Sequence, residues 1–70
     1  MVVWYDRATK FVYGLGAVTV TIVRGLPAIE SATWDFDTQD FIVGWNGTIE
    51  GNGPWWLWSD GNLHATPEEV

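Results

Sequence analysis

The feature that most constrains the fold is an alternation of side chains over residues 17–24. Val18, Val20 and Ile22 would share one face of an extended chain, and two threonines and a valine would occupy the other. A period of two built from β-branched residues is typical of a half-buried strand. No stretch of a dozen residues spaces its apolar side chains as an amphipathic helix does. The sequence therefore predicts an all-β fold with no internal helix.

Glycine, proline and short polar residues divide the rest of the chain into further strands. Asn46-Gly47 is typical of a type I′ hairpin turn, and Asp60-Gly61 predicts a second hairpin that pairs Trp58 with Leu63. The expected strands cover residues 2–5, 10–13, 17–24, 28–36, 41–45 and 55–58, with the first two paired across residues 6–9 and turns at residues 25–27 and 37–40. This pattern predicts an antiparallel barrel or sandwich of about 6–8 short strands. We expect a single β domain over residues 1–65 and a short C-terminal arm at residues 66–70.

Two glycines are expected to change the course of one strand. Gly14 and Gly16 are expected to mark a β-bulge or a sharp bend of their strand.

The alternation also predicts which side chains are buried. The expected core consists of apolar residues from the predicted strands, namely Val18, Val20, Ile22, Trp34, Phe36, Phe41, Val43 and at least one of Trp56 and Trp58.

Composition excludes several classes of site and partner. The 70 residues include no cysteine and one histidine, so disulfides and a zinc site are not expected. The net charge is −6: residues 1–24 carry three bases and one acid, and the remaining residues carry eight acids and no base. Because three basic residues cannot neutralise a run of phosphates, we expect no nucleic-acid partner. The longest uncharged apolar run, residues 11–23, is too short to span a membrane as a helix.

No motif in the sequence points to catalysis or to a cofactor. Asp35, Asp37 and Asp40 lack the spacing and the glycine of a calcium loop, so they predict a polar turn. Neither Ser31 nor Ser59 lies in a nucleophile elbow. We therefore expect a chain that is not an enzyme and that carries no cofactor or metal.

The motif that suggests a function is the run of aromatic residues at residues 55–58. On a strand, Trp56 and Trp58 would share one face, and Trp55 and Leu57 the other. One face can be core, which leaves the other to be covered by another chain, and tryptophan is enriched at binding hot spots. The predicted protein interface comprises Trp55, Trp56, Trp58, Trp4, Arg7, Lys10 and Val70, with the basic residues meeting acids of the adjoining chain.

These observations predict a non-catalytic structural or interaction protein, with a protein partner or a homo-oligomer as its assembly. A small subunit or cement-type component, such as a phage capsid decoration protein, is one concrete form. Two alternatives stay open: a carbohydrate-binding module with a tryptophan platform, and an acidic inhibitor that imitates the charge of nucleic acid. In the first, Asp60, Asn62 and Asn52 would bind sugar hydroxyls. We expect a soluble chain without a secretory signal, since Asp6 interrupts the apolar start; its location is left open, with a virion as one option.

Overall fold

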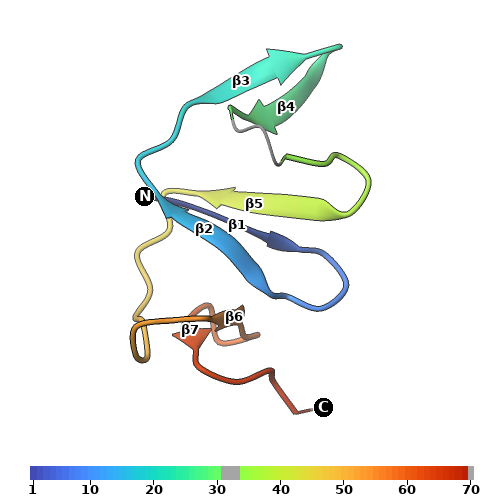
Figure 1. Ribbon diagram of the computed structural model, residues 1–70. Coiled ribbons are helices and arrows are strands. Elements are labelled where there is room, and N and C mark those ends of the chain that lie inside the picture. Colours follow the sequence, from blue (N-terminus) through green and yellow to red (C-terminus); the bar gives the residue numbers. More distant parts are fainter. Residues whose placement is uncertain (31–33, 70) are drawn as a thin grey trace.

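The computed structural model describes residues 1–30 and 34–69, and within these ranges it contains strands and no helix (Figure 1). The strands are β1 (Val2–Asp6), β2 (Val12–Gly16), β3 (Val20–Val23), β4 (Leu26–Ile29), β5 (Gln39–Val43), β6 (Trp56–Leu57) and β7 (Leu63–His64). The prediction of an all-β chain is confirmed. The strands form three small open sheets, in the orders β2-β1-β5, β3-β4 and β6-β7. The predicted barrel or sandwich is supported only loosely, because strands of two to five residues form separate open sheets and do not close into a barrel.

The central sheet begins with the predicted hairpin between β1 and β2. Tyr5 lies opposite Val12, and β2 continues to Gly16, three residues beyond the predicted end. In the turn, the Asp6 carboxylate accepts hydrogen bonds from the backbone N–H groups of Ala8 (2.9 Å) and Thr9 (2.8 Å). These bonds satisfy backbone N–H groups where the chain reverses and the strands no longer pair. Strand β5 completes the sheet by pairing with the other edge of β1.

The expected bulge lies in β2. Tyr5 pairs with Val12 and Trp4 pairs with Gly14, so Tyr13 is an extra residue without an opposite partner. The indole of Trp4 lies against Gly14, and a Cβ at that position would overlap the ring. Gly14 is therefore required by packing, whereas a Cβ at Gly16 would meet open space.

The type I′ turn occurs at a different place from the predicted one. Arg24 and Gly25, with φ of 53° and 78°, connect β3 to β4 as both central residues of such a turn, and Leu26 and Pro27 belong to β4. The predicted turn at residues 25–27 is thus displaced. The predicted long strand ends at Ile29; residues 31–33 lie outside the described residues, and residues 34–36 form no strand.

The predicted hairpin at Asn46-Gly47 is wrong. Neither residue has the positive φ that a type I′ turn needs, and Val43 pairs with Val2 of β1. Trp45 follows β5 and is buried, with its N–H donating to the carbonyl of Met1 (2.8 Å). Long-range pairing of β5 with β1 and burial of Trp45 outweigh the local preference of the dipeptide.

The hairpin at Asp60-Gly61 is confirmed, but its register differs by one residue. Leu57 lies opposite Leu63, and Trp58 donates its N–H to the carbonyl of Asn62 (3.0 Å). The loop therefore has three residues, and Gly61 supplies the positive φ (84°) at its last position. The one-residue difference decides that Leu57, rather than Trp58, faces Leu63.

The hydrophobic core lies between one face of the central sheet and the β6–β7 hairpin (Figure 1). It consists of Val3, Tyr5, Val12, Trp45, Leu57 and Leu63, with Leu15, Ile42 and Trp55 packed against it. The Trp45 indole N–H donates to the carbonyl of Gly61 (2.7 Å), which fixes the hairpin on the sheet.

The predicted core is wrong as a set. Ile22 is 67% exposed and Val43 63% exposed. The others are only half-buried, namely Val18, Val20, Trp34, Phe36, Phe41, Trp56 and Trp58. For Val20 and Ile22 the reason is that the β3–β4 hairpin lies at one end of the molecule, away from the core, where alternation does not lead to burial (Figure 1).

We expect Gly14→Ala to destabilise the fold by about 1–3 kcal/mol, because the new methyl group must displace the Trp4 indole. Gly16→Ala, in the same strand, is the matched control and should change the free energy of unfolding by less than about 0.5 kcal/mol. Urea denaturation followed by tryptophan fluorescence measures both. Equal effects of the two variants would show that Trp4 does not hold this position.

Leu63, 1% exposed, lies at the centre of the core, so Leu63→Ala should lower the free energy of unfolding by about 2–5 kcal/mol. Val43→Ala removes an apolar side chain that is mostly exposed and should cost less than about 0.5 kcal/mol. Thermal denaturation followed by circular dichroism compares them. A larger loss of stability in Val43→Ala than in Leu63→Ala would contradict this description of the core.

Candidate interaction surfaces

The tryptophan segment, residues 55–58, alternates between two environments as its sequence predicts. Leu57 is buried in the core, and Trp55 packs against the same cluster while donating its indole N–H to the carbonyl of Gly51 (3.2 Å). Trp56 faces the other way, and its ring meets the ring of Phe11 edge-on at 5.4 Å between centroids. One face of this segment is therefore core, and on the other face the Trp56 ring packs against Phe11 of the same chain.

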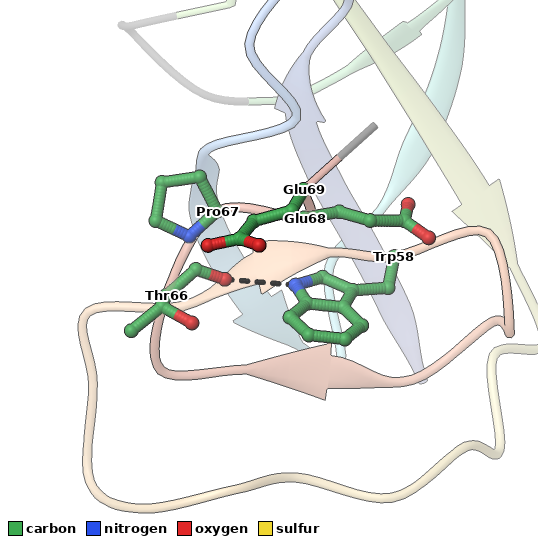
Figure 2. Close-up of a pocket in the computed structure, with 5 residues that line it drawn as sticks. All are labelled: Trp58, Thr66, Pro67, Glu68 and Glu69. Atoms are coloured by element: carbon green, nitrogen blue, oxygen red, sulfur yellow. Dashed lines mark hydrogen bonds between the residues drawn. The ribbon is translucent and has the colours of Figure 1, made fainter.

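Trp58 lies under the C-terminal residues of the chain (Figure 2). Its indole N–H donates to the carbonyl of Thr66 (2.8 Å), and beside it is a hollow of about 570 Å³ that Pro67, Glu68 and Glu69 also line. The Glu68 carboxylate accepts hydrogen bonds from the N–H (2.9 Å) and hydroxyl (2.5 Å) of Ser59. These contacts hold residues 66–69 against the β6–β7 hairpin.

His64 connects Trp58 to two carboxylates. Its imidazole stacks on the indole with centroids 3.8 Å apart and an interplanar angle of 25°. Nε2 lies 2.9 Å from Asp60 Oδ2, and Nδ1 lies 3.4 Å from Glu50 Oε2. The hydrogen bond with Asp60 is the main cause that raises the pKa of His64 above its ordinary 6.5, and Glu50 acts in the same direction. When His64 is protonated, both ring nitrogens can donate, one to each carboxylate.

Ser59 and His64 have different partners in this cluster. The Ser59 hydroxyl donates to Glu68 and not to His64, so His64 is not positioned to activate it. Within residues 1–30 and 34–69, no group of three or more histidines and carboxylates is arranged to hold a metal ion. The cluster instead stabilises the hairpin turn, since Asp60 also accepts the N–H of Asn62 (2.8 Å).

The remaining residues of the predicted interface also make contacts within the chain. Trp4 is half-buried over Gly14, and the ammonium of Lys10 lies 5.4 Å from the centroid of the Tyr5 ring. The guanidinium of Arg7 donates to the carbonyls of Phe36 (3.2 Å), Asp37 (3.3 Å) and Gln39 (2.8 Å). Val70 lies outside the described residues. Contact of these residues with another chain stays a prediction.

The structure reveals an exposed apolar surface that sequence reasoning missed, at the tip of the β3–β4 hairpin. Ile22 is 67% exposed, Leu26 53% and Val23 42%. The two residues at the base of β4, Ala28 and Ile29, are buried, so burial decreases along the hairpin from base to tip. The available signal was the pair Ile22-Val23, two adjacent apolar residues that interrupt the alternation at the end of the run.

A hollow of about 440 Å³ lies beside this tip. Val23, Arg24 and Leu26 form one wall, and the segment of residues 34–37 forms the other. Trp34 in that segment packs edge-on against Phe36 and Phe41, with centroids 5.8 and 5.5 Å apart. We call Ile22, Val23 and Leu26 the hairpin tip.

Comparisons of the chain with protein families, with curated proteins and with solved structures found no match to any of them.

The described part of the chain contains no helix of the length and hydrophobicity needed to cross a membrane.

The raised pKa of His64 predicts how the stability of the folded chain depends on pH. The protonated imidazole should stabilise the folded state fully below pH 6.5, and this contribution should disappear as the pH rises through the higher pKa of the folded state. Titration of the His64 ring by NMR should therefore give a midpoint above 6.5. Asp60→Asn should move this midpoint down, while its amide oxygen can still accept the N–H of Asn62.

Glu69→Gln is the control for the loss of one negative charge nearby, and it should leave the midpoint almost unchanged. A midpoint at or below 6.5 in the unmodified chain, or equal midpoints in the unmodified chain and in Asp60→Asn, would contradict the assignment of Asp60 as the main partner.

Proposed function

We propose that this chain is a non-catalytic interaction protein that acts as a small subunit of a protein assembly, and that the hairpin tip is its contact surface. The observation that carries the proposal is the exposure of large apolar side chains on both faces of one hairpin end: Ile22 on one face, and the opposed pair Val23 and Leu26 on the other. Large apolar side chains gathered in water at one end of a domain are typical of contact sites between proteins. A neighbouring chain that covers the tip would remove these side chains from water.

The composition of the hairpin supports a role in contact and not in catalysis. Residues 20–23 are Val-Thr-Ile-Val and carry no charge, in a chain whose net charge is −6. Interface centres are depleted of charged residues in the same way. Arg24 and Gly25 form a tight turn, so the apolar side chains are presented by the strand residues on either side of a short, well-defined loop.

The two alternatives have weaker support from the described contacts. The Trp58 ring is stacked on His64 and lies beside the C-terminal residues, so one of its faces is not open to a sugar. Asp60 bonds to Asn62 and His64, and the Asn62 amide oxygen accepts the N–H of Thr48 (3.0 Å), so both residues already have partners in place of sugar hydroxyls.

For an acidic inhibitor, Asp60 and Glu68 are similarly engaged within the chain. Each has a lowered pKa, caused chiefly by hydrogen bonds.

The test compares tagged chains in extracts of cells that naturally produce the protein. The unmodified chain should elute from size-exclusion chromatography well above the 7.9 kDa of one chain. The double variant Ile22→Lys, Leu26→Lys should elute at the position of a folded single chain, because a charged side chain at the centre of an apolar contact is strongly unfavourable.

The matched control is Val43→Lys, Ile49→Lys, which changes the net charge equally at two other exposed apolar positions. It should elute with the unmodified chain. Elution of the unmodified chain as a monomer in the extract would contradict the proposed function. Loss of assembly in the control but not in the tip variant would move the contact surface away from the tip.

A further inference from the structure

The β3–β4 sheet has two outer edges, and the described residues show no backbone hydrogen bond from either edge to another element. Pro27 lies opposite Ile22, and since proline has no N–H this pair cannot exchange two hydrogen bonds. The bonded pairs are therefore Thr21–Ala28 and Val23–Leu26. The bond from the N–H of Glu30 to the carbonyl of Thr19 (3.0 Å) follows the same alternation.

This alternation determines which backbone groups point outward. On β3 they are the N–H and C=O groups of Val20 and Ile22, which have no partner on β4. On β4 the outward positions are Pro27 and Ile29, and Pro27 offers no donor. Proline protects the β4 edge from pairing, whereas the β3 edge has neither a proline nor a charged side chain to protect it.

We infer that the partner at this edge is a second copy of the chain, paired antiparallel through β3 about a two-fold axis. This inference rests on the proposed function and names its partner. Val20 of one copy lies opposite Ile22 of the other, and each of these pairs exchanges two hydrogen bonds. Thr21 faces its own equivalent on the axis, and the result is a four-stranded sheet in the order β4-β3-β3-β4.

Three properties favour a second copy over an unrelated segment. The edge is self-complementary, because the outward donors and acceptors of Val20 meet those of Ile22 and the side chains are both β-branched. The paired strands carry no charge, so the net charge of −6 on each copy places no like charges opposite one another. This register also brings Arg24 of each copy to the base of the other hairpin, where Glu30 lies. Neither Arg24 nor Glu30 has a side-chain hydrogen bond or ion pair to any described residue.

The surface area that each chain must bury to form a stable dimer is a small part of its total surface. A stable interface buries at least about 1,000 Å² in total, which is roughly 500 Å² for each copy. One chain exposes 4653 Å², so the dimer needs about a ninth of that surface. Because the backbone of a short strand alone does not supply this area, the side chains of β3, including Ile22 and Val23, must contribute to the contact.

The experiment uses the absence of native cysteine, so that one introduced thiol reports on one position. Thr21→Cys places two thiols on the axis, where opposite Cα atoms that are not hydrogen-bonded lie about 4.5 Å apart, a separation that a disulfide spans. Thr19→Cys is the matched control, since the two copies of residue 19 would lie roughly 13 Å apart. Under mild oxidation, Thr21→Cys should form a covalent dimer and Thr19→Cys should remain a single chain.

Sedimentation equilibrium on the purified chain measures the same contact without a cross-link. The unmodified chain should reach twice 7.9 kDa with increasing concentration. Thr21→Asp should raise the dissociation constant about tenfold or more, because like charges meet on the axis, and Thr19→Asp, with the same net charge, should change it much less. Near-ultraviolet circular dichroism verifies that each variant keeps the fold.

The outcomes separate this inference from the proposed function. Cross-linking at position 21 but not 19, together with a dimer mass, supports β3 pairing. A dimer that cross-links at both positions or at neither overturns it in favour of another surface. A purified chain that stays at 7.9 kDa overturns the second copy as partner; if the same chain elutes in a large assembly from extracts, the proposed function stands with a different protein at the tip.

Discussion

The packing of the β6–β7 hairpin against the central sheet is the contact on which the rest of the structure depends. Two strands of two residues each are not stable alone, so their order depends on packing against the sheet beneath them. Leu57 and Leu63 supply the apolar area, and backbone bonds join the two parts: the N–H of Val12 to the carbonyl of Trp55 (3.0 Å), and the N–H of Leu57 to the carbonyl of Lys10 (2.9 Å). In a chain without disulfides, this burial has to provide most of the stability.

The opposite end of the molecule is packed less completely, and this difference connects the fold to the proposed function. The core cluster includes no residue of β3 or β4, and the hairpin tip is exposed. At this end the indole N–H of Trp34 is enclosed without a hydrogen-bond partner among the described residues, which costs about 1–3 kcal/mol. An isolated two-stranded hairpin gains stability when another strand extends it. A second copy at the β3 edge would provide that strand.

Local turn chemistry predicted part of the fold, and non-local pairing determined the rest. The Asp60-Gly61 hairpin and the pairing of β1 with β2 were found from sequence, because each joins residues that are close along the chain. The pairing of β1 with β5 joins Val2 to Val43, and no local signal identifies it. That pairing removes Val43 from the predicted hairpin at Asn46-Gly47. For the site, the tryptophan segment was found because of its composition, whereas the exposure of Ile22 became visible only when the hairpin was placed relative to the core.

The sequence by itself determined that this chain is all-β, where several of its turns occur, and that Trp55 and Leu57 share a face opposite Trp56 and Trp58. These properties follow from backbone preferences and from a period of two, which act between near neighbours. Only the tertiary structure decided which of the alternating faces is buried. The run at residues 17–24 and the strand β1 both have apolar faces, yet β1 lies at the centre of the molecule and Ile22 lies in water. The reason is that burial depends on which elements lie opposite a strand, and here that arrangement follows from pairing between distant segments and from the space that Leu63 and Trp45 fill.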